Sequence, residues 1–333
     1  MTRTGSALHG QVAATTKILG IMLLGIAAML LSFGALEART RHATIALTFD
    51  DLPALTIIKN QGYVNDLNAA LLRGLQRHGI PATGFVNESK LDDLDRPQQI
   101  DVLKHWLDAG MDLGNHTFSH QSPNSLGAAA YIADIARGEP VTRGLLEARH
   151  RRIGWFRHPY LETGTPGAVK QEIDAWLSAH GYRIAPVTID ADDWEFAEPY
   201  DDVIARHDEA ERKRIKELYL AHSTTTIRWY RGAALGLFGR DIAYVMLLHA
   251  TRLNADSIDD LAAMLKREHL RPVTLSQAMK DPAYRTADPY TGKEGIEWME
   301  RWSMALHKAL PWSSFRDVPK EIETAYDRVD HDR

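Results

Sequence analysis

Ile45-Ala46-Leu47-Thr48-Phe49-Asp50-Asp51 is the stretch that decides the fold. Its first five residues are mostly apolar or β-branched, so the run predicts a short buried strand. Pro53 follows and stops the strand, because proline cannot donate to a sheet ladder. Neighbouring side chains of an extended chain point to opposite faces, so Asp50 and Asp51 share one side only if the chain turns there. Such a turn places both acids at the mouth of the fold; otherwise one acid caps a turn and the other is solvated.

Strand-like and helix-like segments alternate about seven times over roughly 230 residues, which is typical of a parallel α/β fold, either a barrel or an open sheet. The predicted helices cover 62–78, 97–108, 166–179, 200–221 and 255–268. Further strands are predicted at 82–86, 111–115, 153–156, 184–189, 244–248 and 271–275. No linker divides this region, so 43–280 is predicted as one domain. Residues 281–333 form a loop-rich C-terminal extension with a weak helix around 296–310 and a charged end.

The composition is that of a globular protein, and its charge argues against nucleic-acid binding. The chain has 333 residues, of which 44% are hydrophobic and 25% charged, and its formal net charge is −5. Phosphate binding needs a concentrated basic face, which a mildly acidic chain does not favour. The chain contains no cysteine, so a metal ion would have to be held by His, Asp or Glu.

The N-terminal residues, 1–38, are predicted to lie outside the fold. Arg3 and Lys17 precede an uncharged run from 18 to 36, and small residues end it. This order is typical of a signal peptide. The uncut run is also long enough for a membrane anchor, which needs ~20 residues. Both alternatives predict an exported protein, periplasmic, extracellular or membrane-anchored, with the folded domain outside the cytoplasm.

A pair of histidines follows the strand predicted at 111–115. His116 and His120 are four residues apart and share one face if the backbone is helical. Two imidazoles so placed can bind one metal ion, although no Glu follows the first His as in zinc proteases. With Asp51 they make three protein ligands and leave one position open, as catalytic sites do. The alternative is a histidine pair on the surface or in the core.

Three further polar clusters follow predicted strands. An Arg in Arg157-His158-Pro159-Tyr160 can hold a buried carboxylate ionised, or lie on a surface turn. The acids of Asp190-Ala191-Asp192-Asp193-Trp194 could form a calcium loop, but its glycine and distal Glu are missing. His249 closes the apolar run Leu247-Leu248, where a histidine is usually part of the core. In a barrel, all these clusters would meet at the mouth where strands end.

The five clusters, in this order, resemble the five motifs of the polysaccharide deacetylase family, which is the NodB-homology domain or carbohydrate esterase family four. The similar region spans about residues 43–276. The resemblance implies a distorted (β/α) barrel of about seven strands. It also implies a divalent metal, most often Zn²⁺ with Co²⁺ possible, and hydrolysis of N- or O-acetyl groups on a polysaccharide or oligosaccharide.

The resemblance also implies a role for each motif residue. Asp50 would be the general base, held by Arg157, and Asp51 would bind the metal with His116 and His120. His249 would be the general acid, oriented by an Asp of the fourth motif, for which we prefer Asp193 over Asp190. The substrate-binding residues would be Tyr160, Trp194 and Leu247, with Leu247 in the pocket for the acetyl methyl. The chemistry agrees, because a metal polarises a carbonyl, a carboxylate accepts a proton and an imidazole donates one.

Two other functions are compatible with parts of the pattern. An envelope carbohydrate-binding protein could keep the groove without turnover, but a pure binder needs neither Asp50 nor His249. A haloacid-type phosphatase needs a second Asp two positions after the first, where this chain has Leu52. The sequence leaves open whether the substrate is peptidoglycan, a chitin-type oligomer or acetylated xylan.

Overall fold

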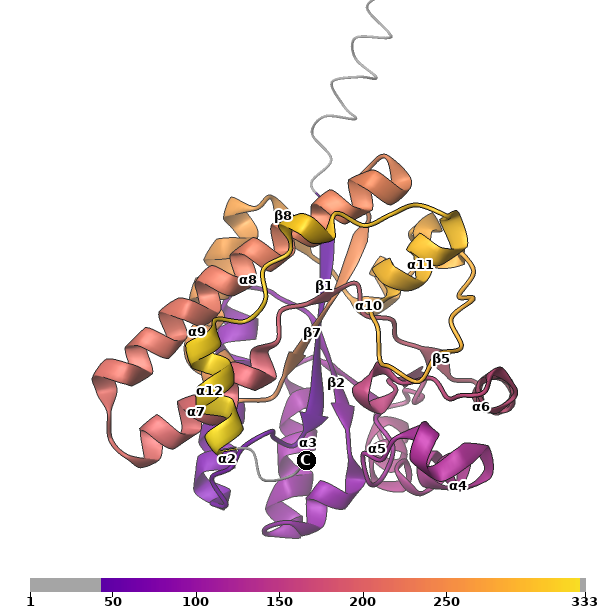
Figure 1. The fold of residues 1–333 in the computed structure, drawn as a ribbon. Helices are drawn as coiled ribbons and strands as arrows, with labels where there is room; N and C mark the ends of the chain where they lie inside the picture. Colours follow the sequence, from indigo (N-terminus) through magenta and orange to yellow (C-terminus); the bar gives the residue numbers. More distant parts are fainter. Residues whose placement is uncertain (1–42, 330–333) are drawn as a thin grey trace, which may run out of the picture. The chain divides into compact units, whose positions relative to one another are not determined.

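The computed structural model describes residues 43–329, whose helices surround a parallel sheet (Figure 1). The predicted N-terminal signal or anchor lies outside the described residues. Within residues 43–329, no helix is both long and apolar enough to cross a membrane.

The strands are β1 (Ala43–Leu52), β2 (Ala82–Val86), β3 (Asp112–Asn115), β4 (Trp155–Phe156), β5 (Arg183–Ile184), β6 (Ile189–Asp190), β7 (Ala243–His249) and β8 (Leu270–Pro272). The helices are α2 (Gln61–Arg77), α3 (Arg96–Asp108), α4 (Pro123–Arg137), α5 (Pro140–Glu147), α6 (Gly167–Ala179), α7 (Asp193–Ala205), α8 (Glu209–Phe238), α9 (Arg252–Arg267), α10 (Leu275–Ala278), α11 (Trp298–Leu306) and α12 (Lys320–Val329). Strand β1, predicted from 45–51, lies at the centre of the sheet, between β2 and β7.

The sheet is curled because its two edges are neighbours in the sequence. The strand order is β5-β4-β3-β2-β1-β7-β6, with β8 beside the first residues of β1. Laid flat at a spacing of ~4.8 Å, the seven strands would place β5 and β6 roughly 29 Å apart. The five residue steps from Ile184 to Ile189 span at most about 18 Å. The sheet therefore bends into a half-barrel of seven parallel strands, which confirms the predicted distorted barrel.

One predicted strand is wrong in an informative way. The apolar run 184–189 is not a continuous strand, because its two ends belong to opposite edges of the sheet. The Ala185 N–H donates to the Phe156 carbonyl at 2.8 Å, whereas the Thr188 N–H donates to the Val245 carbonyl at 2.9 Å. Residues 185–188 therefore cross the open seam of the barrel.

Most predicted helices agree with the structure to within a few residues, but 200–221 is not one helix. Helix α7 begins at Asp193 and ends at Ala205, and α8 begins only at Glu209. His207 between them has a φ of 58°, which no helix interior tolerates. The Asp208 side chain then accepts a hydrogen bond from the Glu211 N–H and so begins α8 as its N-cap. The last predicted strand, 271–275, is also shorter, because Thr274 caps α10.

The C-terminal extension folds onto the barrel rather than away from it. Met299 and Trp302 of α11 are fully buried in the main core. The charged end forms α12, which packs against α7 (Figure 1). Ile322 of α12 shares a buried apolar cluster with Phe196 and Tyr200 of α7. The extension thus lies close to the fourth motif, where α7 begins.

Candidate active site

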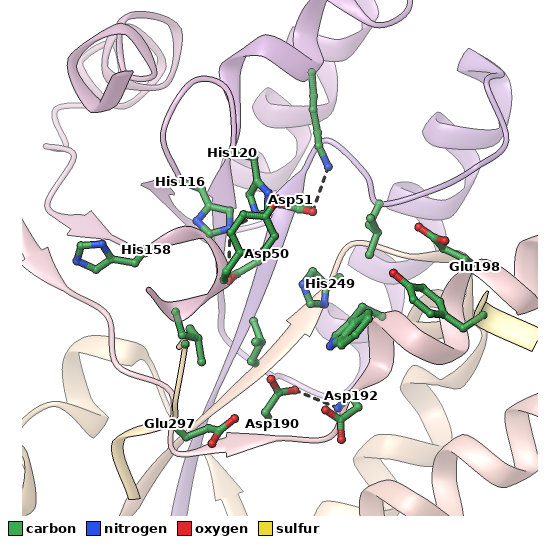
Figure 2. Close-up of a pocket in the computed structure, with 18 residues that line it drawn as sticks. Asp50, Asp51, His116, His120, His158, Asp190, Asp192, Glu198, His249 and Glu297 are labelled. Atoms are coloured by element: carbon green, nitrogen blue, oxygen red, sulfur yellow. Dashed lines mark hydrogen bonds and ion pairs between the residues drawn. The ribbon is translucent and has the colours of Figure 1, made fainter. Parts of the chain in front are cut away.

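A bulge at the end of β1 places two adjacent acids on one side of the sheet. Asp51 has a φ of 66°, and the pairing of β1 with β2 shifts register between Phe49 and Leu52. A bulge turns the strand locally, so neighbouring side chains no longer alternate. Both carboxylates are buried yet line the same cavity (Figure 2). The bulge is therefore the turn that the sequence required for the two acids to share one side.

The loop after β3 carries His116 and His120 but is not helical. Thr117 and His120 both have positive φ angles, of 65° and 55°. Two local hydrogen bonds between backbone and side chain fix the loop. The Thr117 N–H donates to Asn115 Oδ1 at 2.7 Å, and the His120 N–H donates to Thr117 Oγ1 at 3.0 Å. The helical arrangement considered for the pair is therefore wrong, although the loop still brings both imidazoles to one point.

Asp51, His116 and His120 form a cluster that fits a divalent cation. Asp51 Oδ1 lies 3.6 Å from His116 Nε2 and 3.4 Å from His120 Nε2, and one donor atom of each residue lies within 4.8 Å of the others. Within residues 43–329, the buried Asp51 Oδ1 has no hydrogen-bond partner. His116 Nδ1 lies 2.8 Å from the Arg157 carbonyl, which only accepts, so Nδ1 donates and Nε2 presents its lone pair. A second hydrogen bond that orients the ring is typical of metal-binding histidines.

The charges around Asp51 favour its ionised form. Burial opposes ionisation, but the positive charge of Lys90 above all, followed by His120, holds the pKa of Asp51 well below its usual range. Burial also lowers the pKa of His116, which keeps it neutral. Lys90 Nζ lies 3.1 Å from Asp51 Oδ2, and no pattern in the sequence pointed to this lysine.

Arg157 holds the other acid, Asp50, in place. Its Nη1 lies 3.1 Å from Asp50 Oδ2. The rest of the guanidinium donates to the Ala185 carbonyl at 2.9 Å and to Thr48 Oγ1 at 3.0 Å, so the side chain is fixed. Burial raises the pKa of Asp50 to about 6, although Arg157 opposes the rise. Asp50 is thus a carboxylate that can accept a proton near neutral pH.

Asp193 orients His249, which is the register partner of Asp50 on the neighbouring strand β7. His249 Nδ1 lies 2.8 Å from Asp193 Oδ1, and the His249 N–H donates to Asp193 Oδ2 at 2.8 Å. Asn254 on α9, which the sequence did not single out, donates to the same oxygen at 2.5 Å. Burial lowers the pKa of His249, but Asp193 outweighs it and raises the pKa to about 9. Asp190 instead accepts a hydrogen bond from the Asp192 N–H at 3.0 Å.

These groups meet in a cavity of about 500 Å³ (Figure 2). The predicted substrate-binding residues Tyr160, Trp194 and Leu247 line it, while Arg157 and Asp193 act from behind its wall. In Figure 2, Asp50, Asp51, His116 and His120 gather together, whereas Asp190, Asp192 and Glu297 lie away from them. Three lining residues come from the C-terminal extension, where no sequence motif pointed to them: Gly295, Glu297 and Tyr326. The Tyr326 ring packs edge-on against Trp194, with 5.1 Å between centroids.

Comparison with known proteins agrees with the first three clusters. The family model for polysaccharide deacetylase matches residues 37–185. A chitin deacetylase of Colletotrichum lindemuthianum is 26% identical over 162 residues, which are 48% of this chain and 56% of that protein. A peptidoglycan-N-acetylglucosamine deacetylase of Bacillus cereus is 24% identical over 153 residues, 46% of this chain and 47% of that protein. The chain therefore spans about half the length of the curated relatives it matches.

Two solved structures show weaker similarity to this chain. A polysaccharide deacetylase of Bacillus cereus has a TM-score of 0.49 and 18% identity, over 70% of this chain and 91% of that one. A family 4 carbohydrate esterase of Streptomyces lividans in complex with acetate has a TM-score of 0.47 and 20% identity, over 71% and 95%. The family match ends at residue 185, so the position of His249 in the cavity and its contact with Asp193 come from the geometry alone.

Proposed function

We propose that the protein, whose residues 37–185 match the polysaccharide deacetylase family, is a metal-dependent hydrolase that removes acetyl groups from the sugars of a polysaccharide or oligosaccharide. One observation carries this proposal. The candidate cation ligands Asp51, His116 and His120 share one cavity with a carboxylate and an imidazole whose pKa values are about 6 and about 9.

The division of labour follows from the contacts. Asp51, His116 and His120 would hold a divalent cation, for which zinc suits two imidazoles and one carboxylate. When bound, such a cation supplies Lewis-acid polarisation of a carbonyl oxygen and lowers the pKa of water. Asp50, ionised above about pH 6 and fixed by Arg157, accepts the proton of the attacking water.

His249 acts on the opposite side of the reacting centre. With a pKa of about 9 it is protonated at neutral pH, and Nδ1 is engaged by Asp193, so Nε2 is the nitrogen that can donate to the leaving amine or alcohol. Leu247, which is buried yet lines the cavity, suits the acetyl methyl. Tyr160 and Trp194 offer ring faces on which a sugar can lie. All these residues lie within the proposed catalytic domain, 43–280, which precedes the extension at 281–333.

We infer an N-acetylated sugar as the substrate, because the two curated relatives are named for chitin and for the N-acetylglucosamine of peptidoglycan. The test is acetate release by the purified protein from chitin oligomers, peptidoglycan and acetylated xylan, with chelator and then with added zinc or cobalt. Metal-dependent release from an N-acetylated substrate supports the proposal. No release from any of the three with metal bound would instead support a carbohydrate-binding protein.

We also propose that the protein is exported through its N-terminal segment, by cleavage or as a membrane anchor. The run of uncharged residues from 18 to 36 after Arg3 and Lys17 supports this. Cell fractionation combined with mass spectrometry of the N-terminus tests it and separates cleavage from anchoring. A soluble cytoplasmic protein that begins at Met1 would refute it.

A further inference from the structure

A small apolar cluster forms part of the cavity wall. It consists of Leu161, Val187 and Leu247, is separate from the main core and is buried. Leu161 and Leu247 both line the cavity. Under the proposed function this cluster surrounds the acyl group, so its position decides which acyl groups fit.

The C-terminal extension fixes two of the three members of this cluster. Arg301 Nη2 donates to the Leu161 carbonyl at 2.8 Å. The Trp298 N–H donates to the Val187 carbonyl at 2.8 Å, and Val187 lies in the segment that crosses the seam between β5 and β6. Residues far beyond the family match thus hold the wall of the cavity.

The turn that carries Leu161 needs such support. Tyr160 and Leu161 both have a φ of 55°, and two successive side-chain-bearing residues in the left-handed region persist only where their surroundings fix them. The extension passes directly over this turn at Gly295. A Cβ on Gly295 would lie 1.6 Å from the Tyr160 carbonyl oxygen, so only glycine allows this approach.

Arg301 is the side chain that ties these segments together. It is fully buried, and its guanidinium donates to Thr163 Oγ1 at 3.3 Å and to the Ile296 carbonyl at 3.0 Å as well as to Leu161. Asp288 Oδ2, at 3.1 Å, balances its charge. Only a guanidinium has enough donors in a fixed plane to serve all of these acceptors, so lysine is not an equivalent replacement.

We propose that Arg301 is a positioning residue that holds the turn at 160–163 so that Leu161 stays against Leu247, and that it thereby sets the size of the acyl group that the cavity accepts. This inference rests on the proposed deacetylase function. It places residues 288–301 of the extension in the specificity-determining structure of the site.

The test compares N-acetyl and N-propionyl chitin oligomers as substrates of the full-length protein and of Arg301→Lys. One methylene in an apolar pocket changes kcat/KM by roughly 10–200-fold, so the native protein should prefer the acetyl substrate on that scale. Arg301→Lys should raise the propionyl-to-acetyl ratio of kcat/KM by about 5-fold or more. This ratio is insensitive to the amount of folded enzyme, so a loss of stability alone does not change it.

Two further variants keep the test decisive. Trp302→Leu is the matched control, because Trp302 is fully buried on the same helix but packs on Phe238 and Tyr284. It should lower stability and leave the ratio unchanged. Gly295→Ala displaces the turn from the other side and should raise the ratio even if Arg301→Lys fails to fold. An unchanged ratio in both Arg301→Lys and Gly295→Ala, or an equal rise in Trp302→Leu, would overturn the proposal.

Hydrogen exchange separates this inference from the proposed function. The amide of Leu161 donates to the His158 carbonyl and that of Glu162 to the Pro159 carbonyl. Arg301→Lys should speed exchange of these amides, measured by mass spectrometry on peptides covering 157–165, while Trp302→Leu should not. If the native protein hydrolyses neither substrate, the proposed function fails. Unchanged exchange in Arg301→Lys refutes the positioning role whatever the activity.

Discussion

Asp51 lines the cavity and Asp193 lies behind its wall, and the hydrogen-bonding capacity of these two buried carboxylates is satisfied to very different degrees. Asp193 accepts hydrogen bonds from the imidazole and backbone of His249 and from Asn254. Asp51 Oδ1, by contrast, has no hydrogen-bond partner within residues 43–329 and faces two imidazole nitrogens. A buried polar atom without a hydrogen-bond partner costs ~1–3 kcal/mol of stability. Such an atom is expected in a native structure where a bound ligand compensates for this cost. We therefore propose that Asp51 binds a cation and that Asp193 positions His249.

The two buried arginines differ in the same way from the candidate cation ligands Asp51, His116 and His120. Arg157 and Arg301 are almost fully buried, and each donates to several acceptors from different segments. Both are therefore interpreted as positioning groups, one for Asp50 and the other for the turn at 160–163. Substitutions of the candidate cation ligands are therefore expected to change metal binding. Substitutions of positioning groups are expected to change only the rate, the specificity or the pH dependence.

His249→Ala should produce the largest loss of rate without loss of metal. Removal of a general acid lowers kcat by about 10²–10⁴-fold. The zinc content should stay unchanged, because His249 is held by Asp193 and is not part of the Asp51 cluster. Steady-state acetate release and elemental analysis measure the two effects. If the variant lost its metal in proportion to its activity, His249 would be a metal ligand and its assignment as the general acid would be wrong.

Asp193→Asn should lower the rate less and should move the pH dependence. Asp193 raises the pKa of His249 to about 9 against the effect of burial. Without that charge the pKa falls, so the protonated imidazole is lost at lower pH and the alkaline limb of the kcat/KM profile shifts to lower pH. The profile is measured from about pH 6 to about pH 10.

Asp201→Asn is the control for this shift. Asp201 is a buried carboxylate on the same helix, α7, but it accepts hydrogen bonds from Tyr63 and Thr56. Its substitution should affect stability and leave the alkaline limb where it is. If both variants shifted the limb equally, or if Asp193→Asn did not shift it, the positioning role of Asp193 would be wrong.

Removal of the metal should abolish turnover, whereas its effect on stability should be modest. A cation that binds only the folded protein stabilises it by about 2.7 kcal/mol at 100 times its Kd. For a domain of this size, chelation should therefore lower Tm by about 5 °C. The midpoint is followed by circular dichroism with and without zinc. Asp51→Asn should show almost no dependence on zinc, and a native protein equally insensitive to zinc would contradict the proposed cation site.

Sequence reasoning found the elements whose pattern is local. The strand that ends in Asp50 and Asp51 and the helices around it follow from apolar periodicity, and each motif lies where a strand ends. It failed where the outcome depends on partners far away in the chain. The run 184–189 was predicted as one strand, but its two ends form β5 and β6, which pair with β4 and β7 at opposite edges of the sheet. The break before Glu209 did have a local signal, since Asp208 is a favourable N-cap.

The candidate site shows the same limit. Its motif residues could be predicted because five polar clusters follow predicted strands in the order that resembles one family. Lys90, Arg301 and Tyr326 were not, because nothing in their neighbourhood distinguishes them from surface residues before the chain is folded. The His116–His120 loop lies between these cases. Its spacing indicated a shared ligand, but the positive φ angles that create the geometry left no sequence signal.

The most direct test of the account compares Asp51→Asn with Asp50→Asn, because the two neighbours are assigned different roles. Asparagine keeps the shape of aspartate and removes the charge. Zinc content and acetate release are measured for both variants against added zinc. The account predicts that Asp51→Asn binds zinc at least about 100-fold more weakly and regains some activity with excess zinc. It predicts that Asp50→Asn keeps its zinc and shows no turnover at any zinc concentration. Loss of zinc from Asp50→Asn, or full activity in both variants, would contradict it.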